Sequence, residues 1–163
     1  MSKSAFLLPV DAKKYFLVQV FSDSEEMVES IQELRGKKRR DDADVRACTL
    51  RYEAVGVSRS GKKQITGELG TLFFNATDLH FGVAIHELTH AAIYAARRLG
   101  IDPMKRNPTS YSRCPEERFV RILQSMTEKF YAKLPLAIED LKRAEAKSKN
   151  QLADHLMGIL TRK

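Results

Sequence analysis

The residues best suited to chemistry in this sequence are five in a row, His-Glu-Leu-Thr-His, at positions 86–90. Two histidines four residues apart on a helix project from one face, one turn apart, so their imidazoles can bind a single Zn²⁺. A glutamate directly after the first histidine can act as general base towards a water molecule. The pattern predicts metal-assisted hydrolysis, with His86 and His90 as metal ligands and Glu87 as the catalytic base.

The helix that carries this motif is expected to turn its histidines away from the protein core. At about 100° per residue, His86 and His90 lie nearly opposite a single apolar stripe. That stripe consists of Phe81, Ile85, Leu88, Ala92, Ala95 and Leu99. Such histidines form either a surface pair or a metal-binding pair that faces a cleft, and we predict the metal-binding pair. Glu87 lies about a quarter turn away, so its carboxylate can reach a water in the open coordination position without occupying that position.

A zinc site of this type requires a third protein ligand. The candidates are Cys114, Glu116 and Glu117, at the start of the next expected helix. Acidic residues in a first helical turn also interact favourably with the helix dipole, so one of the two carboxylates can serve that purpose alone. Helical phase favours Glu116, which lies nearer to the apolar residues of that helix, whereas Glu117 points away from them. The residues alone therefore leave the third ligand open.

The motif resembles the zincins, the HExxH metallopeptidases, and among them the Glu-zincins, whose third ligand is a glutamate on a later helix. The segments 86–101 (HELTHAAIYAARRLGI) and 116–127 (EERFVRILQSMT) are more closely similar to a group of small phage-encoded proteins regarded as metallopeptidases. Their pattern is HExxHA, a helix that ends in Gly-Ile, and an acidic pair whose second member is the regular one. The resemblance implies one Zn²⁺ per chain, held by His86, His90 and Glu117, with Glu116 as the alternative, and a peptide or protein substrate.

The resemblance covers only Leu72 to Thr127 and departs from the thermolysin-like enzymes, which share the HELTH sequence. Their second helix carries an NExxSD pattern that this chain lacks, so no thermolysin-like substrate range is implied. In zincins an edge strand lines the cleft and pairs with an extended substrate, and Leu72–Asn75 is placed like that strand. A residue that stabilises the transition state is also expected, and Tyr111 and Arg113, in the loop before the second helix, are the candidates.

Hydrophobic periodicity and turn residues predict the elements that position this site. The expected strands are 15–21, 46–55 and 64–75, and the last two form a hairpin around a turn at 58–63. The expected helices are 24–35, ended by Gly36; one that follows Thr77, its expected N-cap, and runs to Leu99; 115–133; and, beyond Pro135, 136–149 and 151–160. The charged run 37–44 is typical of a solvated loop, the alternative being a contact with a polyanion. The expected fold class is α+β: a small zincin-like domain with a β-sheet, one covering helix, the HExxH helix, a second ligand helix and a helical C-terminus.

The 163 residues are predicted to form a single domain, 1–163, around one core. No apolar run is long enough for a membrane span and no signal-peptide pattern is recognisable. Both observations favour a cytoplasmic location, in the host cell if the chain is phage-encoded.

Lys and Arg exceed Asp and Glu by 28 to 21, a net charge of +7, which permits attraction to nucleic acid. One alternative function is therefore a catalytically inactive module in which the metal joins two helices and the basic surface binds nucleic acid or a host protein. In a second alternative, the HELTH sequence arises by chance and the protein binds no metal.

Overall fold

The computed structural model describes residues 3–36, 45–52, 55–57, 63–65, 67–102 and 114–160. Its centre is a four-stranded mixed sheet made of β1 (Lys3–Pro9), β2 (Tyr15–Phe21), β3 (Ala47–Arg51) and β6 (Glu68–Asn75). The strand order is β1-β2-β6-β3. β1 and β2 form an antiparallel hairpin, β2 pairs in parallel with β6, and β6 pairs antiparallel with β3. The strand β1 was not predicted from the sequence.

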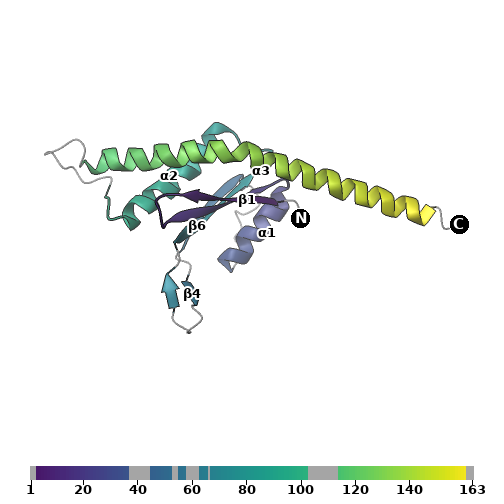
Figure 1. The fold of residues 1–163 in the computed structure, drawn as a ribbon, viewed down its shortest axis with the longest axis horizontal. Coiled ribbons are helices and arrows are strands. Elements are labelled where there is room, and N and C mark those ends of the chain that lie inside the picture. The colour runs from purple at the N-terminus through teal and green to yellow at the C-terminus, as the bar shows by residue number, and fades with distance from the viewer. Residues whose placement is uncertain are drawn as a thin grey trace.

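The two faces of the sheet are covered by different helices (Figure 1). The helix α1 (Ser24–Arg35) lies on one face, and α2 (Phe81–Arg98) and α3 (Pro115–Leu160) lie on the other. The strand β6 is buried on both sides, since Leu72 and Phe74 belong to the cluster under α2 and α3, while Phe73 packs against α1. Burial on both faces explains the continuous apolar run of β6. The predicted α+β class is confirmed.

The helix α1 begins and ends at the predicted residues because both of its caps are local. The carboxylate of Asp23 accepts hydrogen bonds from the backbone N–H groups of Glu25 and Glu26, at 2.6 and 3.2 Å. Gly36 ends the helix with a φ of 72°, in the left-handed region that glycine adopts at little cost. Met27 and Ile31 bury its apolar side against the sheet.

The motif helix α2 begins later than predicted. Thr77 does not cap it, because the Thr77 backbone N–H and hydroxyl both donate to the Asn75 side-chain oxygen, at 3.0 and 2.9 Å, in a turn before the helix. His80 is the residue before the first turn. The buried face of α2 is rich in alanine, which lets the sheet and α3 approach closely: Ala84, Leu88, Ala91, Ala92, Ala95 and Ala96. Phe81, expected in the apolar stripe, is 66% exposed and stacks on Tyr131 of α3.

The helix α3 runs through Pro135, so the predicted break at that residue is wrong. A proline in a helix interior removes one backbone hydrogen bond and costs about 3 kcal/mol. Pro135 itself is exposed, while Leu134, Ala137 and Leu141 are buried in the core on the same side of the helix. The burial of these side chains across the proline keeps both halves in one helix.

The predicted hairpin between the segments 46–55 and 64–75 is confirmed in its pairing. β3 pairs antiparallel with β6 within the sheet, and β4 (Val55–Val57) pairs antiparallel with β5 (Lys63–Ile65) in a separate two-stranded ribbon. The expected turn falls mainly on 58–62, and the charged run on 37–44, both outside the described residues. The expectation that Leu72–Asn75 forms an edge strand is wrong, because β6 lies between β2 and β3. The edge strand beside α2 is β3.

Candidate active site

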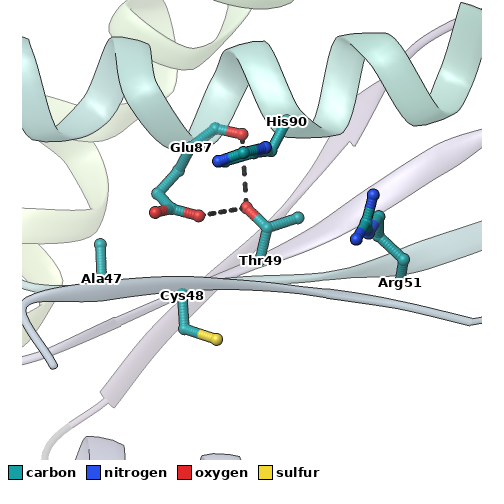
Figure 2. A pocket seen from close by; sticks show the side chains of 6 residues that line it. All are labelled: Ala47, Cys48, Thr49, Arg51, Glu87 and His90. Carbon is teal, nitrogen blue, oxygen red and sulfur yellow. Dashed lines mark hydrogen bonds between the residues drawn. The ribbon is translucent and has the colours of Figure 1, made fainter. Parts of the chain in front are cut away.

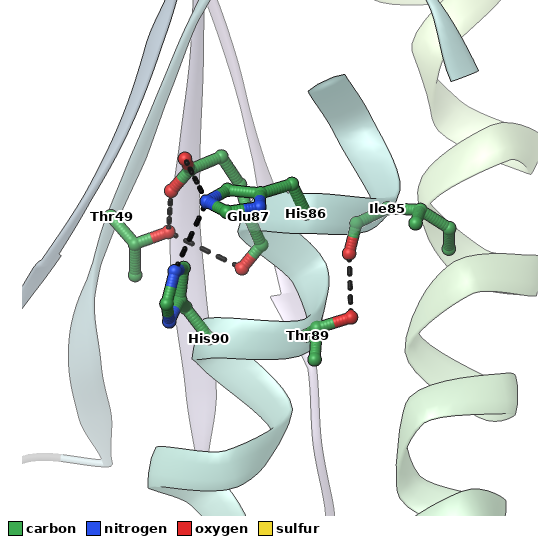
Figure 3. Close-up of polar contacts among 6 residues, drawn as sticks. All are labelled: Thr49, Ile85, His86, Glu87, Thr89 and His90. Atoms are coloured by element: carbon green, nitrogen blue, oxygen red, sulfur yellow. Dashed lines mark hydrogen bonds and ion pairs between the residues drawn. The ribbon is translucent and has the colours of Figure 1, made fainter. Parts of the chain in front are cut away.

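The two motif histidines point towards one another from consecutive turns of α2 (Figure 3). Their Nε2 atoms are 3.1 Å apart, and their rings meet edge to face with centroids separated by 4.7 Å. Both residues are exposed, and the side chain of His86 is 68% accessible to solvent. The prediction that these histidines lie off the core face is confirmed.

The separation of the two nitrogens can be compared with what zinc requires. Two nitrogens that bind one zinc at about 2.05 Å in a tetrahedral arrangement lie about 3.3 Å apart. The observed 3.1 Å between the Nε2 atoms of His86 and His90 is close to that value. Without a metal, two neutral imidazoles reach the same distance by sharing one proton in a hydrogen bond. The separation of the two Nε2 atoms is therefore compatible with their binding one zinc ion.

Glu87 lies between α2 and the edge strand β3 and is only 9% exposed. The hydroxyl of Thr49 donates to its Oε2 at 2.5 Å and also lies 3.3 Å from the Glu87 backbone carbonyl. The other carboxylate oxygen, Oε1, lies 4.0 Å from His86 Nε2. One carboxylate oxygen is thus held by the sheet, and the other is directed towards the histidine pair (Figure 3).

A cavity of about 240 Å³ opens between α2 and β3. Figure 2 shows Glu87 and His90 reaching into it from α2, with Thr49 and Arg51 on the facing side of β3 and Cys48 on the opposite side. The Arg51 guanidinium lies 5.9 Å from the ring centroid of Tyr94, one helical turn beyond His90. The cavity therefore runs from a carboxylate at one end to a cation at the other.

The edge strand β3 directs the backbone groups of alternate residues away from β6, at the rim of this cavity. The Arg46 carbonyl accepts a hydrogen bond from the Asn75 N–H at 3.3 Å, and the Tyr52 N–H donates to the Leu69 carbonyl at 3.2 Å. The backbone groups of the even-numbered residues of this segment are therefore directed towards β6. In an antiparallel pair the alternate residues turn their N–H and C=O groups the other way. The outward groups consequently belong to Ala47, Thr49 and Arg51, whose side chains face α2.

Among the residues that the structure describes, no third metal ligand joins the histidine pair. Within the described ranges, no group of three or more His, Cys, Asp or Glu side chains could hold a metal ion. Glu117 Oε1 accepts from Arg121 Nε at 3.0 Å within α3, and Glu116 is exposed. Cys114 is partly buried and makes no disulfide. The role of Glu117, and of Glu116 as the alternative, stays a prediction, and Tyr111 and Arg113 lie outside the described residues.

The cavity residues that β3 contributes, among them Thr49 and Arg51, were not identified from the sequence. Thr49 and Arg51 come from β3, which is separated from α2 by a ribbon and the whole of β6. The alternation of apolar and polar residues predicts that one face of such a strand is accessible. No signal in the sequence indicates which element this face meets, because that depends on the strand order of the sheet.

Comparison of the chain with protein-family models, with curated proteins and with solved structures found no match. None of the helices within the described ranges combines the length and the apolar character that a membrane span requires.

Proposed function

We propose that this protein is a zinc-dependent metallopeptidase whose metal is held by His86, His90 and Glu117, with Glu116 as the alternative third ligand. The observation that carries the proposal is the convergence of two imidazole Nε2 atoms, 3.1 Å apart, beside a buried carboxylate. A surface histidine pair alone would not need a glutamate that is fixed by another element of the fold. The hydrogen bond from Thr49 to Glu87 supports a catalytic assignment for that carboxylate.

Zinc, when bound, would polarise the scissile carbonyl and lower the pKa of a water molecule at the site. The proton transfer is carried out by a residue of the chain. Glu87 Oε1, which faces the histidines, accepts the proton of the attacking water and later delivers it to the leaving amine. Thr49 keeps Oε2 occupied, so the carboxylate presents Oε1 in one orientation. The low exposure of Glu87 restricts bulk water around the base.

The edge strand β3 provides a way to align the substrate. An extended peptide can add to an open sheet edge through backbone hydrogen bonds, and alternate side chains then determine specificity. The outward N–H and C=O groups of Ala47, Thr49 and Arg51 are such an edge, directly below the motif helix. We assign to β3 the role that the sequence analysis gave to Leu72–Asn75.

The proposal is tested by measuring zinc content and peptide hydrolysis on the same preparations. We expect about one zinc per chain in the wild type, less in His86→Ala and in the variant of the true third ligand, Glu117→Ala or Glu116→Ala. Glu87→Gln should keep the zinc and lose the hydrolysis of a fluorescently labelled unfolded protein. Glu29→Gln, an exposed glutamate of α1, is the matched control and should retain both.

Two results would contradict the proposal. Absence of zinc from the wild type, even after incubation with the metal, would refute the metal site. Zinc-dependent folding combined with unchanged biological activity of Glu87→Gln would favour the inactive binding module instead, because that role needs the ligands and not the base.

A further inference from the structure

We propose that Arg51 selects substrates with an acidic side chain within two residues of the scissile bond. This inference rests on the proposed peptidase function and adds a substrate class to it. Arg51 lines the cavity that contains Glu87 and His90, and its guanidinium lies above the ring of Tyr94. It is the positively charged side chain that β3 presents to that cavity.

The position of Arg51 relative to the catalytic base follows from the strand. Thr49, which holds Glu87, and Arg51 are two residues apart on β3, so their Cα atoms are separated by about 6.6 Å and their side chains share one face. On α2 the same direction leads from Glu87 past His90 to Tyr94. Arg51 therefore stands at the end of the cavity away from the base.

A peptide paired with the outward groups of β3 brings its own side chains to defined places. Residues directly opposite each other in a sheet project from the same face, so the peptide residue opposite Arg51 points towards α2 and the guanidinium. The peptide residue opposite Thr49 lies next to Glu87 and the histidine pair. The side chain that Arg51 meets is thus two residues from the one nearest the base.

Charge complementarity identifies the preferred side chain. Among the described residues, no carboxylate lies within ion-pair distance of Arg51, and its guanidinium lies over the neutral ring of Tyr94. Glu87 at the other end of the cavity disfavours an acidic group there, because like charges repel. An Asp or Glu opposite Arg51 gains a partner, whereas a Lys or Arg at that place faces a like charge.

Peptide binding to the zinc-loaded Glu87→Gln protein tests this preference without turnover. The probes are three fluorescent extended peptides that differ only in carrying Glu, Gln or Lys at one position, with that position moved along the peptide in successive sets. We expect the Glu peptide to bind roughly twofold to fivefold more tightly than the Gln peptide at one position, with the difference reduced in 1 M salt. Arg51→Glu should reverse the order, so that the Lys peptide binds best.

Arg46→Glu is the matched control. It changes the net charge by the same amount on the same segment, but Arg46 belongs to the alternate residues, which face away from α2. Equal affinities for the three peptides in every set, or an Arg46→Glu effect as large as that of Arg51→Glu, would overturn the inference. If the wild type hydrolyses peptides in a Glu87-dependent way with no acidic preference, the inference fails and the proposed function stands. If no peptide of any composition is bound or hydrolysed, both fail.

Discussion

The hydrogen bond between Thr49 and Glu87 gives the sharpest test of the site. Thr49→Val keeps the shape of the side chain and removes the hydroxyl that donates to Glu87 Oε2 at 2.5 Å. A hydrogen bond to a charged group contributes about 1.5–3 kcal/mol, and Glu87, with 11% of its side chain exposed, recovers little of this from water. We take about 1.5–2 kcal/mol, which corresponds to a loss of roughly 10- to 30-fold in kcat/KM if the bond orients the base.

The measurement is kcat/KM of the zinc-loaded variants, with zinc content and Tm determined on the same samples. Thr49→Ser retains the hydroxyl and should stay within about threefold of the wild type. Thr89→Val is a second control on α2 itself, because its hydroxyl donates to the Ile85 carbonyl at 2.7 Å and does not contact Glu87 (Figure 3). The reasoning is refuted if folded, zinc-loaded Thr49→Val is as active as the wild type, or if Thr49→Ser is impaired to the same extent as Thr49→Val.

Three further predictions concern the fold. Gly36→Ala forces a Cβ into a left-handed conformation and should lower the free energy of unfolding by about 1 kcal/mol, or Tm by about 2–4 °C; an unchanged Tm would contradict the cap. Pro135→Ala restores a helical hydrogen bond and should raise the free energy of unfolding by about 1–3 kcal/mol in urea denaturation; a decrease would show that the proline shapes α3. Burial, and then the hydrogen bond to Glu68, raises the pKa of Tyr52 from 10.0 to about 12, so its contribution to stability is present below about pH 10 and lost as pH rises towards 12. Stability of Tyr52→Phe should therefore fall less between pH 10 and 12 than that of the wild type, and equal slopes would argue against the shift.

Features that depend on neighbouring residues in the chain were predictable from the sequence. The ends of α1 follow from Asp23 and Gly36, which act on groups two to four residues away. The orientation of His86 and His90 follows from helical phase alone, since both lie opposite the buried alanine face of α2. Local chemistry therefore determines both the motif helix and the direction of its two histidines.

Features that depend on tertiary packing were not predictable in this way. A proline usually ends a helix. At Pro135, however, the buried side chains of Leu134 and Ala137 hold α3 against the core both before and after the proline. The apolar run Leu72–Asn75 is compatible with an edge strand and with a central strand. Only the pairing of β6 with β2 makes it a central strand. The hydrogen-bond partner of Thr49 is distant in the sequence, since Glu87 lies 38 residues further along the chain.

The position of Thr49 opposite Glu87 depends on the register between β3 and β6. A shift of one residue would turn Thr49 away from α2 and bring Cys48 or Leu50 to the carboxylate, neither of which is a strong hydrogen-bond donor. Gly70 helps to hold the observed register, since it is paired with Arg51 at a φ of 147° and a Cβ there would overlap the Leu50 carbonyl oxygen. Only a residue without a side chain lets β3 lie this close to β6 at that point. The glycine of the central strand thus permits the register in which Thr49 supports Glu87 and Arg51 lines the same cavity.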